Sequence, residues 1–179
     1  MVKNNNSLQQ SVSNEKIIVD FSNFGYIFSS IQYNEFTNYL YDCYEFFDKL
    51  QFVFDKLIPF VSNYTFDTIY SESNKHTHII KKDSKEMNLI KNILKKKLKK
   101  DYNYNDRDIE IFFENNINDY EIWQLGIISG TRIIGTRHLN RFRPIFFDYH
   151  HLIYPDKNFN QPNYKEYDFC PTKGGCKYE

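Results

Sequence analysis

The chain has 179 residues, the usual length of one domain, and 41% of them are hydrophobic, which excludes a disordered protein. Its formal net charge is zero, but residues 81–100 carry nine lysines and two acids, and residues 123–144 carry four arginines and no acid. A protein with zero net charge can therefore still have a positively charged face that attracts a polyanion.

Neither secretion nor membrane insertion is indicated by the sequence. The first residues contain no apolar run, and no stretch stays apolar for long enough to span a bilayer. The cysteines Cys43, Cys170 and Cys176 are an odd, low number for a disulfide framework. We therefore expect a cytoplasmic protein with no membrane segment, and we expect Cys43 to be a small buried hydrophobic residue.

The N-terminal part of the chain predicts a flexible start followed by short strands. Residues 1–14 are polar and aperiodic, whereas residues 15–179 are expected to form a single domain. Short runs rich in β-branched and aromatic residues predict strands at 16–21 and 25–33.

The longest predicted helix spans residues 34–57. Asn34 is the expected N-cap, and Pro59 is expected to end the helix because proline lacks the N–H and clashes with the preceding turn. Spacings of three and four place seven apolar residues on one stripe. We expect this stripe to be buried: Phe36, Leu40, Cys43, Phe47, Leu50, Phe54 and Leu57.

A second, lysine-rich helix follows two strand candidates at 64–70 and 75–80. Asp83 and Glu86 have the spacing of a capping box at its start. An apolar stripe then runs along the helix: Met87, Ile90, Leu94 and Leu98. Residues 109–113, beyond this helix, suit a short strand or a helical turn.

The C-terminal half predicts an antiparallel meander with a turn at Ser129–Gly130. Its expected strands are 120–128, 131–136, 142–147 and 151–154. The whole pattern predicts an α+β fold, with the C-terminal sheet packed against the long amphipathic helix and the lysine-rich helix. The polar, aromatic tail of residues 156–179 is expected to pack across the sheet.

Basic side chains are the first candidate for function. Four of the five arginines lie within twelve residues, and guanidinium groups suit phosphate: Arg132, Arg137, Arg141 and Arg143. A bulge at Gly135 would bring Arg132 and Arg137 to one face. The alternative is that these arginines pair with the acids of residues 101–121. The helix lysines Lys96, Lys97 and Lys100 suit a nucleic-acid backbone, or else form a solvated face.

Histidine and tyrosine side chains near the last strand are the second candidate. His150, His151 and Tyr154 follow Asp148 and Tyr149, and imidazole can serve as a general acid or base near neutral pH. The alternative is that the two histidines close a turn, with one of them half-buried against Tyr154.

A metal site is the third candidate. His76 and His78 alternate on a predicted strand and face the same side, so they could act as ligands together. His150, His151, Asp148, Cys170 and Cys176 are the further ligands that could join them. The spacing of Cys170 and Cys176 is wider than that of a zinc knuckle, so we predict no metal and no cofactor.

Residues 120–155 resemble the closing sheet of RelE-like bacterial toxins. The segment TRIIG at 131–135 and the segment PIFFDYHHLIYP at 144–155 carry the resemblance. Such toxins cleave mRNA without a metal. The resemblance implies that Arg132 contacts phosphate, and that Tyr149, His150 or Tyr154 transfers protons.

Together these patterns predict an RNA-directed toxin or defence-type protein, acting as a metal-independent ribonuclease. Arg132, Arg137 and Arg143 would hold phosphate, and His150 or His151 would act with Tyr154. RNA is the expected partner, with an antitoxin or a host protein as a further one. Two alternatives remain: a non-enzymatic phage or mobile-element inhibitor that binds a host protein or nucleic-acid complex, and a metal-dependent enzyme at the histidines.

Overall fold

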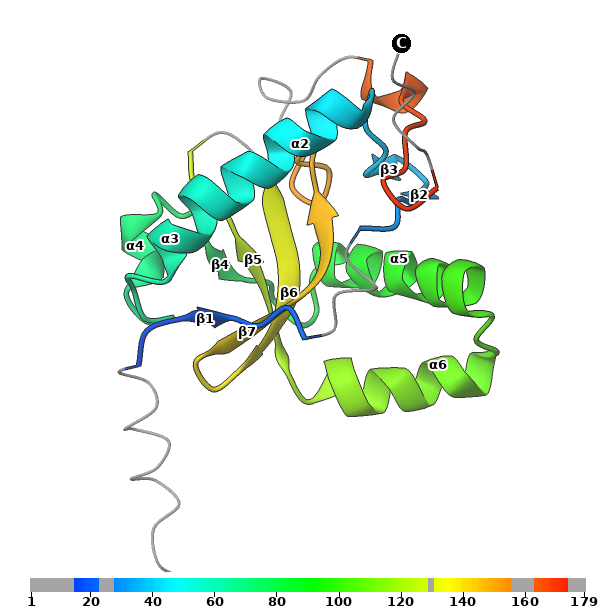
Figure 1. Cartoon of the computed structure of the whole chain (residues 1–179). Coiled ribbons are helices and arrows are strands. Elements are labelled where there is room, and N and C mark those ends of the chain that lie inside the picture. Colours follow the sequence, from blue (N-terminus) through cyan, green and yellow to red (C-terminus); the bar gives the residue numbers. More distant parts are fainter. Residues whose placement is uncertain (1–14, 23–27, 129–130, 156–162, 174–179) are drawn as a thin grey trace, which may run out of the picture.

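A five-stranded sheet forms the centre of the structure, a computed structural model that describes residues 15–22, 28–128, 131–155 and 163–173 (Figure 1). The strand order is β1-β7-β6-β5-β4. The bounds are Ile18–Val19 for β1, His78–Ile79 for β4, Glu121–Leu125 for β5, Arg132–His138 for β6 and Arg141–Asp148 for β7. The pairs are antiparallel except β1–β7, which is parallel. The predicted α+β fold is confirmed, and three of the four predicted meander strands form β5, β6 and β7. The strand predicted at 151–154 is wrong, because these residues form a bend with no strand pairing, and the predicted turn at 129–130 lies outside the described residues.

A β-bulge interrupts the pairing of β6 and β7. Gly135 pairs with Pro144 and Ile134 with Phe146, so Ile145 is the extra residue on β7. A Cβ on Gly135 would lie 2.4 Å from the carbonyl oxygen of Arg143, so only glycine allows this approach. A bulge therefore occurs opposite Gly135, but its extra residue is on β7. Because β6 keeps its regular alternation of faces, the predicted convergence of Arg132 and Arg137 on one face is wrong.

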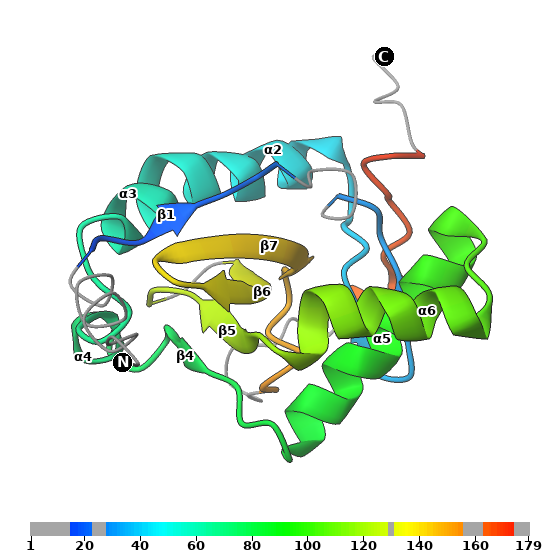
Figure 2. The ribbon, with the colours of Figure 1, turned by 90° about the horizontal axis from the view of Figure 1, so that it is seen from below.

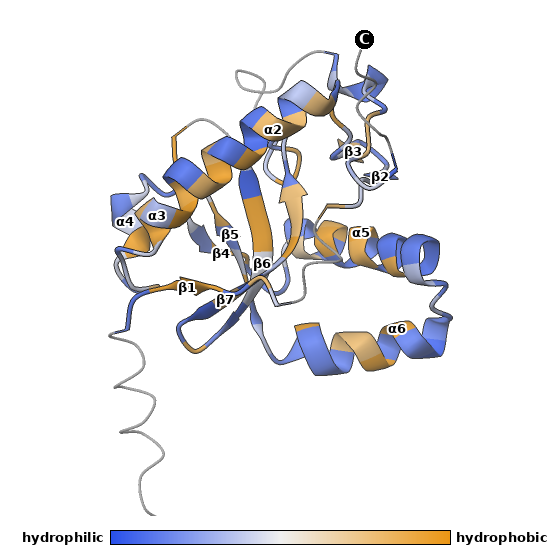
Figure 3. Ribbon diagram, in the orientation of Figure 1, coloured by the Kyte–Doolittle hydropathy of each residue, from blue (hydrophilic) through white to orange (hydrophobic). Residues whose placement is uncertain are grey.

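Helices cover both faces of the sheet (Figure 2). One face packs against α5 (Lys85–Tyr102) and α6 (Asp106–Phe113), through Ile134 and Phe146 of the sheet. The other face packs against α2 (Cys43–Phe52), η2 (Val53–Leu57) and α3 (Ile58–Val61), through Ile133 and Phe147. Figure 3 shows hydrophobic residues along β6 and β7 and also in α2, α3 and α5 on either side of them.

The first long helix is displaced from its predicted position. Asn34 has φ 52° and lies in the turn between β2 (Gln32–Tyr33) and β3 (Phe36–Thr37), so it is not an N-cap. The helix begins after Asp42, whose side chain accepts the backbone N–H of Glu45. It continues past Pro59, because the wider π-helical turn of η2 relieves the clash that proline causes in an α-helix.

The predicted apolar stripe of this helix is only partly buried. Leu57 is buried as predicted, together with Val53 and Val61, whereas Phe47 and Phe54 are 56% and 44% exposed, contrary to the prediction. Aromatic side chains therefore remain on the outer side of α2.

Local signals at the other helices are only partly confirmed. The N-cap of α5 is Ser84, one residue after the predicted Asp83, and its hydroxyl accepts the N–H of Met87. The apolar stripe of α5 is buried as predicted. Residues 109–113 belong to α6, which continues into η3 (Glu114–Asn118). The strand predicted at 64–70 is wrong, because this stretch forms turns and the start of α4 (Ile69–Glu72).

Part of the tail packs against the segment before α2. Phe169 forms a bridge with Leu40, and η4 (Tyr164–Glu166) lies nearby. The N-terminal residues 1–14 and the tail residues 156–162 and 174–179 lie outside the described residues. Within the described chain, no helix combines the length and apolarity needed to cross a membrane.

Candidate functional site

Polar side chains gather at one end of the sheet, where β5 and β7 end and β4 and β6 begin. Arg132 opens β6 and is only 3% exposed. Its Nη1 donates to the carbonyl oxygen of Ile127 at 2.7 Å, and its Nη2 lies 3.2 Å from Nδ1 of His76. We call His76, His78, Gly126, Arg132 and Asp148 the sheet-end cluster.

The absence of a side chain at Gly126 leaves space for the Arg132 side chain to reach His76. A Cβ on Gly126 would lie 2.4 Å from Cδ and 2.7 Å from Nε of Arg132. The N–H of Gly126 donates to the hydroxyl of Thr77, which donates in turn to the Gly126 carbonyl oxygen. These two bonds fix the segment next to His76 and His78 against the end of β5.

Asp148 links the cluster to the segment that carries Tyr154. It is fully buried opposite Arg132 in the β6–β7 register. Its carboxylate accepts the N–H groups of Leu152 and Ile153 at 2.8 and 2.9 Å. Burial lowers the pKa of Arg132 to about 10, against the opposing effect of Asp148, so Arg132 remains charged at neutral pH.

Hydrogen bonds fix the proton positions on both histidines. A guanidinium has no acceptor, so Nδ1 of His76 accepts from Arg132 and carries no proton. Nδ1 of His78 lies 2.9 Å from the Lys75 carbonyl oxygen, which only accepts, so this nitrogen carries the proton. The pKa of each imidazole is lowered, chiefly by burial and further by the charge of Arg132. His78 is therefore neutral at pH 7, with a lone pair on Nε2.

A pocket of about 560 Å³ lies along the outer edge of β4, next to this cluster. We call it the β4-edge pocket. Its lining residues come from α4, β4, β5, the start of α5 and the segment after β7: Tyr70, Lys75, His78, Ile79, Lys81, Ser84, Glu86, Trp123 and Tyr154. The pocket thus combines two exposed lysines, an imidazole and three aromatic rings.

Tyr154 is the predicted catalytic residue that lies in this pocket. Its ring contacts that of His78 edge to face, with 5.0 Å between centroids. Burial, with a further effect of Glu86, raises the pKa of Tyr154 to about 12. Its phenol is therefore protonated at neutral pH and can donate a proton.

The other two predicted catalytic residues lie elsewhere. His150 is 3% exposed, its Nε2 lies 2.7 Å from the Tyr39 carbonyl oxygen, and its ring stacks on Tyr164. His151 is half-buried with φ 58° in the turn after β7. His150 therefore does not converge with the arginines as expected, because it packs against Tyr39 and Tyr164.

The arginines are also dispersed. Arg137 pairs with Glu121 at 3.1 Å and lies over the ring of Phe66, on the face opposite Arg132. Arg141 and Arg143 both pair with Asp20, at 3.7 and 3.5 Å. The predicted pairing with acids of residues 101–121 therefore holds for Arg137 alone among these three.

The three predicted lysines differ in their accessibility. Lys97 is 1% exposed, donates to the carbonyl and hydroxyl oxygens of Ser29, and cannot reach an external phosphate. Burial lowers its pKa to about 8. Lys96 and Lys100 are exposed and lie over the rings of Tyr33 and Tyr39.

No group of three or more potential metal ligands occurs among the described residues. Cys170 is a buried free thiol that accepts the N–H of Ser30, and Cys176 lies outside the described residues. Cys43 is half-buried and disulfide-bonded, so the expectation of a buried thiol there is wrong.

The sequence pattern identified His76 and His78 only as possible metal ligands, and it missed Lys75, Lys81 and Gly126. The alternation of the two histidines indicated a shared face. Arg132, which forms a hydrogen bond with His76, is 56 residues away in the sequence. The strand pairing brings the two residues together, so the sequence pattern alone did not predict this contact.

Comparisons with known proteins identify a family. A family model described as "Uncharacterised protein UU032" matches residues 22–175. A protein of the same description from Ureaplasma parvum serovar 3 (strain ATCC 700970) is 29% identical over 176 residues, covering 96% of this chain and 87% of the relative. No solved structure matches this chain. The extent of the family match shows that the chain belongs to the UU032 family.

Proposed function

We propose that this protein is an RNA-directed protein of the toxin or defence type, which cleaves RNA without a metal in the β4-edge pocket. One observation carries the proposal. The neutral imidazole of His78 shares a single pocket with two lysines and with the protonated phenol of Tyr154. A base, an acid and phosphate-binding cations are the groups that such a reaction needs.

The charges around the pocket favour an anionic substrate. Lys75 and Lys81 are exposed at its rim, and the Ser84 end of α5 adds the positive end of an 18-residue helix. Glu86 is the acidic group in the lining. Two lysines and a helix N-terminus outweigh the single carboxylate, so the pocket has a net positive charge. This net charge suits a negatively charged phosphodiester.

The aromatic lining favours a nucleotide over a simple phosphate. Tyr70 is 47% exposed, and Trp123 and Tyr154 add further rings to the pocket wall. Bases of single-stranded RNA stack on such rings without much sequence preference.

The proposed reaction is a transesterification. Nε2 of His78 takes the proton of a ribose 2′-hydroxyl, whose oxygen forms a bond to the adjacent phosphorus. The bond from phosphorus to the 5′-oxygen breaks, and Tyr154 gives that oxygen its proton. Water then returns the proton from His78 to Tyr154. The products are a 2′,3′-cyclic phosphate and a 5′-hydroxyl end, with no metal or oxidant consumed.

Arg132 acts as a positioning residue in this scheme. It holds the neutral form of His76 through their hydrogen bond, and its positive charge disfavours protonation of His78. It is too buried to contact the substrate itself.

The test uses a labelled single-stranded RNA, incubated with purified protein in the presence of a chelator. His78→Gln should reduce the cleavage rate by about 100-fold or more, as expected for loss of a general base. His138→Gln is the matched control, because His138 is exposed at the opposite end of β6. Equal rates for the two variants, or cleavage of an all-2′-deoxy strand, would contradict the mechanism.

The alternative function is inhibition by binding an antitoxin or host protein, and the outer side of α2 favours it. Tyr44 and Phe47 are 71% and 56% exposed, with Phe54 further along the same helix. Exposed aromatic patches mark protein interaction sites. Recovery of one stoichiometric partner, lost in Phe47→Ser but retained in His78→Gln, would select this alternative.

A further inference from the structure

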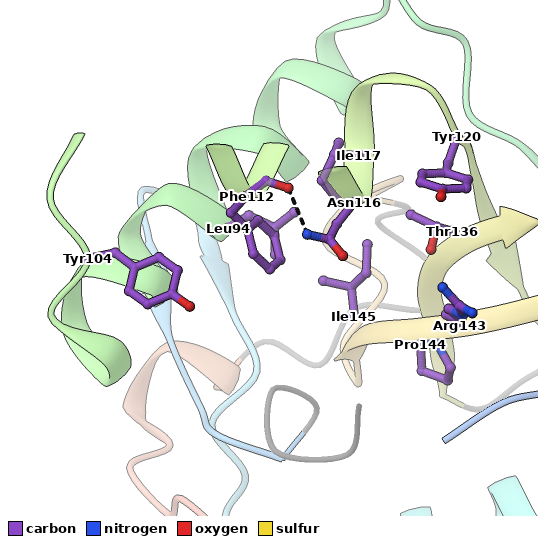
Figure 4. Close-up of a pocket in the computed structure, with 10 residues that line it drawn as sticks. All are labelled: Leu94, Tyr104, Phe112, Asn116, Ile117, Tyr120, Thr136, Arg143, Pro144 and Ile145. Atoms are coloured by element: carbon purple, nitrogen blue, oxygen red, sulfur yellow. Dashed lines mark hydrogen bonds between the residues drawn. The ribbon is translucent and has the colours of Figure 1, made fainter. Parts of the chain in front are cut away.

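A second pocket lies between the α5–α6 helices and the sheet, at the end opposite the sheet-end cluster (Figure 4). Its volume is about 270 Å³, enough for a small metabolite and too small for a dinucleotide. Thr136 and Arg143, which are paired in the register of β6 and β7, are among its lining residues. We call it the bulge pocket, and its role does not depend on the proposed function.

Two irregular elements meet at the bulge pocket. Ile145, the extra residue of the β-bulge, forms part of its wall. Asn116 enters from η3, a π-helical turn that extends α6. Bulges and π-helical turns interrupt regular hydrogen bonding, and they are frequent at functional sites, where they aim a side chain. Here both aim side chains into one cavity.

One donor atom of the cation in the bulge pocket lacks a hydrogen-bond acceptor. Nε of Arg143 is buried and makes no hydrogen bond, and the carboxylate of its ion-pair partner Asp20 is 3.5 Å away. No lining residue is acidic. A buried donor without an acceptor is costly, so an anionic group here would stabilise Arg143.

The opposite end of the bulge pocket is apolar and flat. The rings of Tyr104 and Phe112 lie edge to face there, 6.5 Å apart. The amide of Asn116 donates to the Phe112 carbonyl oxygen, which leaves its own oxygen as an acceptor. Figure 4 shows this amide between the aromatic residues and Arg143.

We propose that the bulge pocket binds a small cyclic monocarboxylate with a ring hydroxyl. The carboxylate pairs with Arg143, the ring lies against Tyr104 and Phe112, and the hydroxyl donates to Asn116. A carboxylate fits better than a phosphate, because the lining contains a single cation, already shared with Asp20.

Calorimetric titration with 4-hydroxybenzoate tests this site, with 4-hydroxybenzamide as the uncharged comparison. The amide should bind at least about tenfold more weakly, since a charge-assisted hydrogen bond is lost. Arg143→Gln should weaken 4-hydroxybenzoate binding by about 10-fold to 100-fold. Arg141→Gln is the matched control, because Arg141 pairs with the same Asp20 and does not line the pocket. It should bind like the unaltered protein.

Three results would overturn the proposal: equal affinity for acid and amide, equal effects of the two arginine variants, or no binding below about 10 mM. Circular dichroism of each variant separates loss of binding from loss of folding. Asn116→Ala supplies a second variant if Arg143→Gln does not fold. It should weaken the binding of 4-hydroxybenzoate and leave the binding of benzoate unchanged. An equal loss of affinity for the two ligands would also contradict the site.

Discussion

Arg132 donates a hydrogen bond to Nδ1 of His76 across the end of β5, where Gly126 leaves space for its side chain. This contact joins the first residue of β6 to the segment before β4, two strands away in the sheet. It fixes the protonation state of His76 and adds positive potential beside His78.

Gly126→Ala is expected to displace Arg132. The new Cβ would lie 2.4 Å from Cδ of Arg132, and overpacking of this kind costs about 1–3 kcal/mol. Urea unfolding should show the loss. In an Arg132→Ala background the same substitution should cost less, because the clashing atoms are absent. An undiminished cost in the double variant would mean that the glycine is needed for another reason.

The pH dependence of RNA cleavage should reflect the ionisation of His78. Its pKa is lowered from 6.5, chiefly by burial, so the rate should rise with pH through a midpoint below 6.5 and then level off. The pKa of Tyr154 is about 12, so no decline is expected between pH 7 and pH 10. A midpoint above 7 in the rate profile would exclude neutral His78 as the base.

Arg132→Met should move that midpoint upward. The charge of Arg132 disfavours protonated His78, so its removal raises the pKa of His78 toward the ordinary value. A nuclear magnetic resonance titration of the His78 ring measures this shift independently of activity. Gln124→Met leaves the charge unchanged at a neighbouring position of the sheet and serves as the control. An unchanged His78 pKa in Arg132→Met would remove the proposed role of Arg132.

Lys97 should make stability increase with pH in the alkaline range. Its pKa is about 8 in the folded protein and 10.5 in the unfolded chain, so the unfolded chain binds more protons between these values. The free energy of unfolding should therefore rise there by about 3 kcal/mol relative to Lys97→Met. Urea unfolding of both proteins at pH 7 and pH 10.5 measures the difference. A constant difference would show that Lys97 titrates normally.

His150→Ala should affect stability and leave catalysis intact. It removes the hydrogen bond to the Tyr39 carbonyl oxygen and the stacking on Tyr164, at a cost of about 1–3 kcal/mol. Cleavage should be measured at a temperature where the variant remains folded. A large loss of rate without loss of stability would restore His150 as a catalytic residue.

The sequence by itself determined the elements whose signals are local. Three of the four predicted meander strands and the apolar stripe of α5 follow from the spacing of neighbouring residues, and these are confirmed. The same reasoning misplaced the first long helix, because Phe36 and Leu40 continue its spacing while being buried in β3 and in a bridge to Phe169. The π-helical turn before Pro59 then allowed the helix to continue.

The composition of the candidate site was decided by the tertiary structure. Regular alternation along β6 places Arg132 and Arg137 on opposite faces, and the bulge on β7 aims Ile145, not an arginine, into a cavity. The turn after β7 buries His150 while the following segment carries Tyr154 to His78. Spacing fixes the face of a residue within its own element, but strand order and register determine which distant side chains meet.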